Sequence, residues 1–260
     1  MPAPVQPSAS QLARKLAEAR ANRQLIDGMP FESIASLADA YSTQSIAIDL
    51  YDSPRIGYKV GATNAVVQKM FGADNPFFGP MFKREHYQAN STIQLLPGIL
   101  GGEAEFAFYC GDDFPTNTDL SVHDLPDLIQ SCHIAVEIVG RRTTGEGLPT
   151  LHAAVADFGA NVAFMDGPSI DNWNSIDLAA INVTAKTDGV QTNNGSGAAV
   201  LGNPLHSLLW LHNALRQQNL GLQRGDWVST GTCLGVIAAV PASSIEIEFE
   251  GCGQMRYQFD

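Results

Sequence analysis

Residues 102–108 read Gly102-Glu103-Ala104-Glu105-Phe106-Ala107-Phe108, a run in which two acidic side chains stand two positions apart. A β-strand points successive side chains to opposite faces of its sheet. As a strand, the run therefore places Glu103 and Glu105 on one face and the two phenylalanines on the other. The pattern predicts a half-buried strand with two carboxylates aimed at one place.

A third acid, Glu137, lies inside the mainly β-branched run Ile134–Val139. Like charges on a half-apolar strand repel one another and lose hydration when they are buried. Hard cations such as Mg²⁺ or Mn²⁺ bind through oxygen ligands and would gather such acids. Glu103, Glu105 and Glu137 are therefore candidate metal ligands. The alternative is a solvated face for the first two and a strand edge for the third.

Glutamates also recur at every second position in the run Ile245-Glu246-Ile247-Glu248-Phe249-Glu250. Here the apolar residues predict a buried face and the glutamates a wet one. This run shows that the same spacing also fits simple solvation. The difference at residues 102–108 is the small or apolar neighbours and the third acid.

The chain has 260 residues, 45% of them hydrophobic, which is enough for one large domain or for a substantial domain with a smaller helical appendage. It carries 15 Lys plus Arg against 27 Asp plus Glu, a net charge of −12. Nucleic acids and anionic membranes both require a basic surface, so neither is an expected partner. An anionic substrate would need a metal or a lysine to offset the charge of the protein.

Several absences favour a soluble, cytoplasmic protein. Residues 1–10 show no secretory signal, and no apolar run approaches the roughly 20 residues that span a bilayer. The four cysteines are far apart and form no CxxC pair, so they are expected to be reduced thiols.

Helical spacing of apolar residues predicts helices at 10–26 and 33–50, in an N-terminal helical part that covers residues 1–54. Residues 55–260 form the predicted β-rich catalytic domain. Its strands include 103–109, the run around Glu137 and the stretches 227–240 and 245–259, while 72–82 is expected to be an irregular loop. Few, segregated helices among mixed strands indicate an α+β fold.

Lys59 is a cation inside a predicted strand, in Gly57-Tyr58-Lys59-Val60-Gly61-Ala62-Thr63. The glycines allow a ligand to approach the backbone, so Lys59 is a candidate partner for a substrate carboxylate or enolate oxygen. An edge-strand lysine that prevents aggregation is the alternative. Thr230-Gly231-Thr232 places two hydroxyls and a flexible glycine near a strand end. Either a ligand contact or a β-bulge would explain this segment.

The order of these segments resembles the 2-keto-4-pentenoate hydratase and 4-oxalocrotonate decarboxylase family, within the fumarylacetoacetate hydrolase superfamily. The matching segments are spread through nearly the whole chain beyond the first helix and are residues 57–63, 72–82, 103–105, 136–139, 155–157, 198–205 and 225–231. The resemblance implies a C-terminal mixed β-sandwich roll, an N-terminal helical part and a homo-oligomer. It also implies Mg²⁺ or Mn²⁺ held by the three glutamates, and Lys59 in the active site.

The leading functional hypothesis is a metal-dependent lyase that hydrates a short 2-hydroxy-2,4-dienoate through a chelated enolate. Its substrate would be a small anionic 2-oxo acid. Lys59 would position or protonate this substrate, and Asp157 or a metal-bound water would assist proton transfer. Arg142 and Thr230 are the further candidate substrate contacts.

Departures from the family pattern keep two alternatives open. Hydratases of the family commonly carry an acid where this chain has Phe77, and the decarboxylase branch tolerates an apolar residue there. Decarboxylation of a 4-oxalocrotonate-like vinylogous 2-oxo acid is therefore the first alternative. Phe77 and the changed segment Phe158–Ala160 together motivate the second, a catalytically silent paralogue that keeps the metal and the oligomer for structure.

Overall fold

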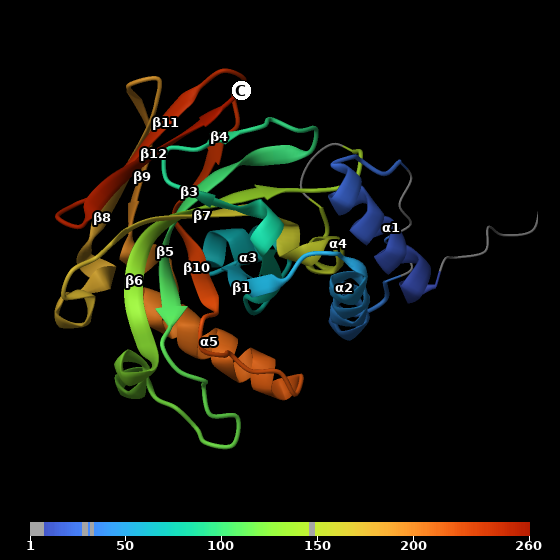
Figure 1. Cartoon of the computed structure of the whole chain (residues 1–260), viewed down its shortest axis with the longest axis horizontal. Coiled ribbons are helices and arrows are strands. Elements are labelled where there is room, and N and C mark those ends of the chain that lie inside the picture. Colours follow the sequence, from blue (N-terminus) through green and yellow to red (C-terminus); the bar gives the residue numbers. More distant parts are fainter. Residues whose placement is uncertain (1–7, 28–30, 32–33, 146–148) are drawn as a thin grey trace, which may run out of the picture.

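The strand that carries Glu103 and Glu105 runs through the middle of a curved mixed sheet (Figure 1). The computed structural model describes residues 8–27, 31, 34–145 and 149–260. The order of strands in this sheet is β2-β1-β10-β5-β6-β7-β3. Their bounds are β1 Arg55–Gly61, β2 Phe77–Phe82, β3 His86–Gln88, β5 Ile99–Cys110, β6 Ile129–Gly140, β7 Asn161–Ser169 and β10 Trp227–Ala238.

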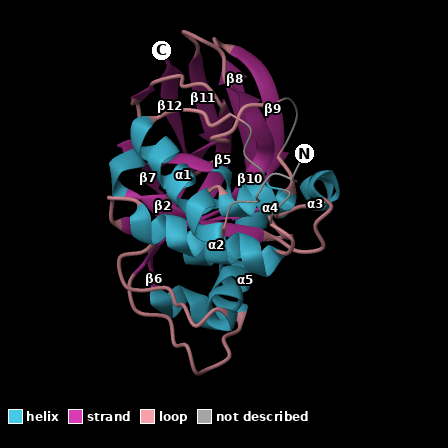
Figure 2. Cartoon of the chain, turned by 90° about the vertical axis from the view of Figure 1, so that its right-hand side faces the viewer, coloured by secondary structure: helices cyan, strands magenta, loops and turns pink. Residues whose placement is uncertain are grey.

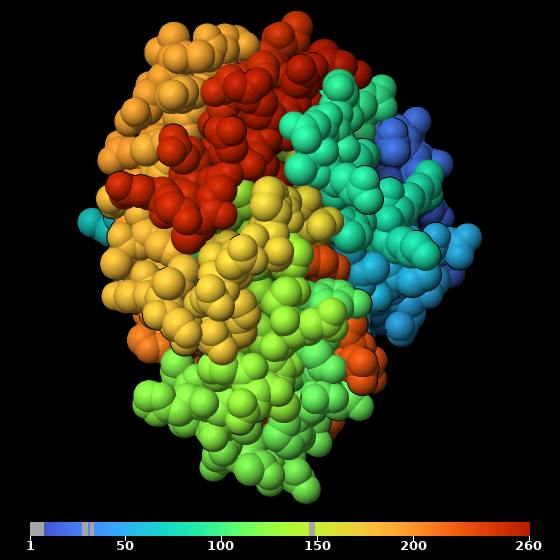
Figure 3. All heavy atoms as spheres, turned by 60° about the vertical axis from the view of Figure 1, so that its left-hand side comes forward, coloured from blue at the N-terminus to red at the C-terminus, as the bar shows by residue number. Residues whose placement is uncertain are grey.

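A second sheet, with the order β4-β12-β11-β8-β9, packs against the first. Its strands are β4 Thr92–Ile93, β8 Asn182–Thr187, β9 Val190–Ser196, β11 Ser244–Phe249 and β12 Gly253–Phe259. In Figure 3 the red C-terminal strands lie beside the teal segment that contains β4, as the parallel pairing of β4 with β12 requires.

The main hydrophobic core fills the space between the two sheets. Phe106 of β5 meets Phe249 of β11 edge to face, with ring centroids 5.0 Å apart. Phe106 and Phe108 are fully buried in this core, which confirms the predicted apolar face of residues 102–108. The predicted alternation of β11 is also confirmed, because Ile247 is buried and Glu248 is exposed.

The helices lie outside the sheets, and α1, α2 and α4 group on one side of the molecule (Figure 2). The helices are α1 Ala9–Asn22, α2 Leu37–Leu50, α3 Ala65–Phe71, α4 Leu151–Ala156 and α5 Pro204–Gln217, with a 3₁₀ segment at Val122–Leu128. This segregation of helices from a mixed sheet is the α+β fold predicted from the sequence. In the described ranges, no helix has the length and apolar character needed to cross a membrane.

A second hydrophobic cluster joins the N-terminal helices to the rest of the chain. Leu12 and Leu16 of α1 pack with Phe77 and Phe82 of β2 and with Phe158. The helices therefore share their core with segments beyond residue 54. The domain boundary at residue 54 stays a prediction.

Local signals set most element ends. The Ser8 side chain caps α1 in a capping box with Gln11, and Arg23 ends the helix in the left-handed conformation, three residues before the predicted end. Ser36 caps α2; the predicted start, Ser33, lies outside the described residues. Asn203 caps α5, with Pro204 at its first position.

The prediction of an irregular loop at residues 72–82 is wrong, because residues 77–82 form β2. Gly79 and Pro80 suggested a loop, since proline cannot donate to a central strand. β2 lies at the edge of its sheet, where that donor is not needed, and Pro80 stands opposite Tyr58 of β1. The 3₁₀ segment Val122–Leu128 begins with a capping box formed by Ser121 and Asp124.

Candidate metal centre

Three carboxylates converge on the concave face of the larger sheet. Glu103 of β5 stands directly opposite Glu137 of β6, and Glu105 follows Glu103 on the same face. One carboxylate oxygen of each residue lies within 4.8 Å of the others. Glu105 and Glu137 are 0% exposed and Glu103 is half-buried, so the alternative of a solvated face is wrong.

Glu105 is held on one side and left without a partner on the other. Its Oε2 atom accepts hydrogen bonds from the Ser229 hydroxyl at 2.6 Å and from the Gly231 amide at 2.8 Å, both on β10. Its Oε1 atom is buried and has no hydrogen-bond partner. A buried carboxylate oxygen with free lone pairs is an available ligand for a hard cation.

Glu137 has the same arrangement. Its Oε1 atom accepts a hydrogen bond from the Asn161 side-chain amide at 3.0 Å. Its Oε2 atom lies 3.0 Å from the Lys59 ammonium, as an ion pair without hydrogen-bond geometry. Each of the two buried glutamates is therefore fixed through one oxygen and presents the other toward the cluster.

The charges of the cluster do not balance within the protein. Burial raises the pKa of Glu103 to about 7, with the nearby Lys59 opposing and Glu137 adding to the rise. Burial, followed by the charges of Glu137 and Glu103, raises the pKa of Glu105 well above its usual range. When all three acids ionise, one ammonium leaves two negative charges uncompensated. The donor set and this deficit fit a divalent cation with oxygen ligands.

Lys59 reaches the cluster because the sheet curls. β1 lies between β2 and β10, so the alternative of an edge-strand lysine is wrong. Three strand spacings separate β1 from β6, about 14 Å in a flat sheet, yet the Lys59 ammonium lies 3.0 Å from Glu137. Burial lowers the pKa of Lys59, but the three glutamates, Glu137 first, raise it above its usual value overall. Lys59 is thus a buried, charged ammonium.

A cavity of about 490 Å³ opens beside the glutamates and includes Lys59 and Glu103 in its wall. Asn64 and Thr232 add polar groups. Most of the remaining wall is apolar and comes from α3, β2 and β10; it includes Val67, Met70, Phe71, Phe77, Leu234 and Val236. The cavity therefore joins a charged cluster to an apolar chamber.

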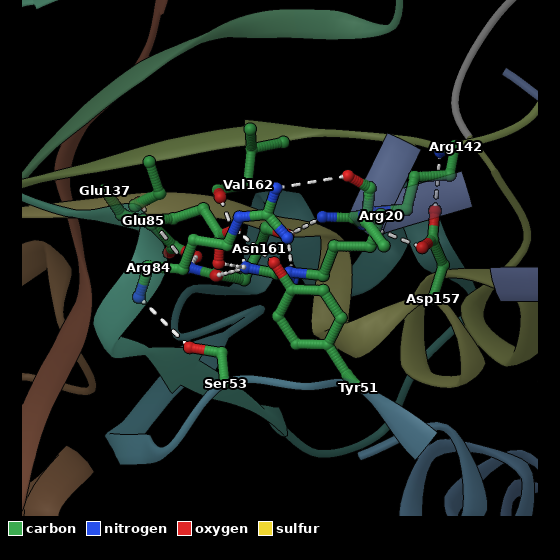
Figure 4. Close-up of polar contacts among 12 residues, drawn as sticks. Arg20, Tyr51, Ser53, Arg84, Glu85, Glu137, Arg142, Asp157, Asn161 and Val162 are labelled. Atoms are coloured by element: carbon green, nitrogen blue, oxygen red, sulfur yellow. Dashed lines mark hydrogen bonds and ion pairs between the residues drawn. The ribbon is translucent and has the colours of Figure 1, made fainter. Parts of the chain in front are cut away.

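A network of arginines supports the cluster from behind (Figure 4). The Arg20 guanidinium of α1 donates to the backbone carbonyl and the side-chain oxygen of Asn161, at 3.0 Å each. Arg142 donates to the same carbonyl at 2.5 Å. Asn161 in turn donates to Glu137. The orientation of this glutamate is thus linked to α1 in the N-terminal helical part.

The backbone before Asn161 forms an unusual turn. Phe158, Gly159 and Ala160 all have left-handed φ angles of 53°, 66° and 60°. Non-glycine residues enter this region at a cost. The guanidinium groups of Arg20 and Arg142 both lie near the Phe158 ring, at 4.9 and 5.1 Å from its centroid.

The other predicted site residues lie apart from the cavity wall. Asp157 and Arg142 form a buried ion pair at 2.8 Å, and Asp157 also accepts from the Arg142 amide. The Thr230 hydroxyl donates to the Phe106 carbonyl, whereas Thr232 lines the cavity. Substrate binding by Arg142 or Thr230 and proton transfer by Asp157 stay predictions.

Sequence reasoning did not identify Asn161, Arg20 or Ser229 as parts of the site. Ser229 stands opposite Lys59 in the pairing of β1 with β10, so the alternation of strand 227–231 would have placed it on the same face. Arg20 and Asn161 lie 141 positions apart in the chain. No local pattern signals their contact.

The chain was compared with known proteins. The model for the fumarylacetoacetate (FAA) hydrolase C-terminal family matches residues 68–260. A 2-keto-4-pentenoate hydratase of Burkholderia vietnamiensis is 30% identical over 262 residues, with 97% of each chain covered. A 2-hydroxyhexa-2,4-dienoate hydratase of Comamonas testosteroni is 26% identical, over 98% of this chain and 97% of that protein.

Among solved structures, 4-oxalocrotonate decarboxylase from Pseudomonas putida G7, complexed with magnesium and adipate, matches with a TM-score of 0.88 and 22% identity. The match covers 97% of each chain and shows that the two proteins share a fold. The carboxylate cluster and the hydratase relatives together define an enzyme of the lyase class. The chain belongs to the fumarylacetoacetate hydrolase family.

Proposed function

We propose that the protein is a divalent-metal-dependent hydratase of a short 2-hydroxy-2,4-dienoate, of the 2-keto-4-pentenoate type. The observation that carries this proposal is the convergence of Glu103, Glu105 and Glu137 beside Lys59, next to a mostly apolar cavity that Glu103 and Lys59 line. The similarity to two hydratases over nearly the whole chain supports it.

In this proposal the three glutamates hold Mg²⁺ or Mn²⁺. When bound, the cation would polarise the carboxylate and 2-oxo oxygens of the substrate and offset negative charge that develops there. The Ser229 hydroxyl and the Gly231 amide hold Glu105 in place, while Asn161 does so for Glu137. These contacts reduce the rearrangement that ligand binding would require.

Lys59 is the proposed partner of the substrate. Its ammonium is buried among carboxylates and stays protonated at neutral pH, so it can donate to an incoming carboxylate or supply a proton. We retain Asp157 as the proposed assistant in proton transfer. Its pairing with Arg142 supports a positioning role for Arg142 at least as well as direct substrate contact. A substrate contact by Thr230 also remains proposed, although its hydroxyl is engaged with Phe106.

The test is turnover by the purified protein with Mg²⁺ or Mn²⁺. We expect loss of 2-hydroxy-2,4-pentadienoate with formation of 4-hydroxy-2-oxopentanoate, followed by ultraviolet absorbance and NMR. Lys59→Met should abolish turnover, whereas Lys69→Met, which removes an exposed lysine from α3, should not. Absence of turnover in the metal-loaded wild type would contradict the proposal.

Decarboxylation of a 4-oxalocrotonate-like acid is the second candidate. Phe77 favours it, because the cavity wall has a phenyl ring where an acid could have handled a water proton. The apolar character of the rest of the wall counts against it, since the substrate carries a second carboxylate. Release of CO₂ from 4-oxalocrotonate, without hydration of the dienoate, would move the assignment to this reaction.

A further inference from the structure

The chamber beyond the metal centre has room that a five-carbon acid does not need. A cavity of about 490 Å³ lies within the range of about 300–1,000 Å³ that holds drug-sized ligands in proteins. A 2-oxo acid that binds the metal through its first two carbons directs its remaining carbons away from the glutamates. These carbons would enter the part of the cavity that α3 and β10 line.

The wall of this part is apolar. Val67, Met70 and Phe71 face it from α3, and Leu234 and Val236 from β10. Transfer of methylene groups from water to such a surface is favourable, roughly in proportion to the apolar area removed from water. The wall therefore suits an alkyl or aryl group.

The cavity offers little to a second anion. Lys59 is the sole cationic side chain among the described residues that line it, and its ammonium is already paired with Glu137. A carboxylate at the far end would give up part of its hydration against methyl, thioether and phenyl groups and would find no cation there. Loss of hydration without a compensating partner is unfavourable for a charged group.

We propose that the preferred substrate is a monocarboxylic 2-hydroxy-2,4-dienoate that carries an apolar substituent at its far end, and that Met70 is a specificity-determining residue. This inference rests on the proposed function, because it takes the metal centre as the anchor of the 2-oxo acid. It adds the chemical class of the rest of the substrate.

The experiment measures binding rather than turnover. Unbranched 2-oxo acids from pyruvate to 2-oxooctanoate, together with the dicarboxylate 2-oxoadipate, are titrated by calorimetry into the Mn²⁺-loaded protein. We expect affinity to rise by about threefold to fourfold for each methylene beyond 2-oxobutanoate. We also expect 2-oxohexanoate to bind more tightly than 2-oxoadipate, which has the same number of carbons.

A charge placed in the wall should reverse this preference. Met70 lines the cavity and is 59% exposed to solvent, so Met70→Arg can be introduced without disturbing the core. The variant should bind 2-oxoadipate more tightly than 2-oxohexanoate. Ala65→Arg is the matched control, because it adds the same charge to the same helix at an exposed residue outside the cavity wall; it should keep the wild-type order.

The outcomes separate the two proposals. If pyruvate binds with Mn²⁺ but affinity does not grow with chain length, or if wild type prefers 2-oxoadipate, the inference about the substituent is wrong and the metal-anchored function stands. If no 2-oxo acid binds the Mn²⁺-loaded protein, the proposed function fails and the inference fails with it.

Discussion

Glu105 and Glu248 are both glutamates on β-strands, but Glu105 is buried and Glu248 is exposed to solvent. Glu248 is exposed on β11, where solvation is sufficient. Glu105 is 0% exposed and has one carboxylate oxygen without a partner. A buried carboxylate oxygen without a hydrogen-bond donor or a cation lowers the stability of the folded protein.

Glu105→Gln should weaken Mn²⁺ binding by more than about 100-fold, because even groups that only support a metal ligand are worth about 10- to 100-fold in affinity. In chelator at pH 8 the variant should be at least as stable as wild type, since a neutral amide replaces a buried carboxyl whose ionisation is costly. Calorimetry and thermal unfolding measure the two effects. Glu248→Gln is the control, and equal Mn²⁺ affinity for both variants would remove Glu105 from the metal centre.

The raised pKa of Glu103 predicts how the metal-free protein responds to pH. Burial raises this pKa from 4.5 to about 7. The folded state therefore binds the proton more tightly than the unfolded state does. This tighter proton binding contributes stability to the folded state. The contribution has its full value below about pH 4.5 and is lost as pH rises through about 7. Mn²⁺ affinity should increase over the same range, because protons no longer compete for the ligand.

Thermal unfolding in chelator between pH 5 and pH 8 measures this contribution as the difference between wild type and Glu103→Gln. The melting temperature of wild type should fall relative to that of the variant as pH rises. Parallel curves for the two proteins would show that Glu103 titrates normally in the folded state.

At the scale of elements, strand alternation made the acid-bearing strand β5 predictable, because both its faces show in a period of two. β2 was not predictable in this way. Gly79 and Pro80 favour a loop in the sequence. The sequence does not show that this segment lies at the edge of a sheet, where proline is tolerated in a strand. The convergence of Glu103, Glu105 and Glu137 needed only adjacent strands, whereas the contact of α1 with Asn161 depends on packing that has no local signal.

That contact links α1 to the candidate metal centre through Asn161. Arg20→Met removes both hydrogen bonds to Asn161, so Asn161 should hold Glu137 less firmly. We expect Mn²⁺ affinity to fall by about 10- to 100-fold, with a loss of stability of about 1–3 kcal/mol because buried acceptors lose a donor.

Arg14→Met is the control for the Arg20 variant, since Arg14 is exposed on the same helix. The Mn²⁺ titration distinguishes a positioning role from a merely structural one. A variant of Arg20 that is less stable but binds Mn²⁺ with unchanged affinity would limit the arginine to structural support.

At the scale of the whole molecule, the shared core of α1 and β2 predicts a single cooperative unit. Leu16 is fully buried in this core, so Leu16→Ala should lower stability by about 2–5 kcal/mol. The three tryptophans, Trp173, Trp210 and Trp227, all lie beyond residue 54. Their fluorescence should nevertheless report the same shifted transition as the helical circular dichroism signal.

Lys15→Ala is the matched control, because Lys15 is its exposed neighbour on α1. An early loss of helix with an unchanged tryptophan transition would show that residues 1–54 unfold as an independent domain. The homo-oligomer that the resemblance implies stays a prediction, which sedimentation equilibrium of the same samples measures.

The left-handed turn at residues 158–160 limits which amino acids these positions can hold in a folded protein. A selection for folded protein should enrich glycine, asparagine and aspartate at position 160 and deplete valine, isoleucine and threonine, because β-branched residues rarely adopt positive φ. Position 158 faces two demands, since its left-handed backbone favours glycine, asparagine and aspartate while Arg20 and Arg142 contact an aromatic ring there. Survivors at that position should be mostly aromatic.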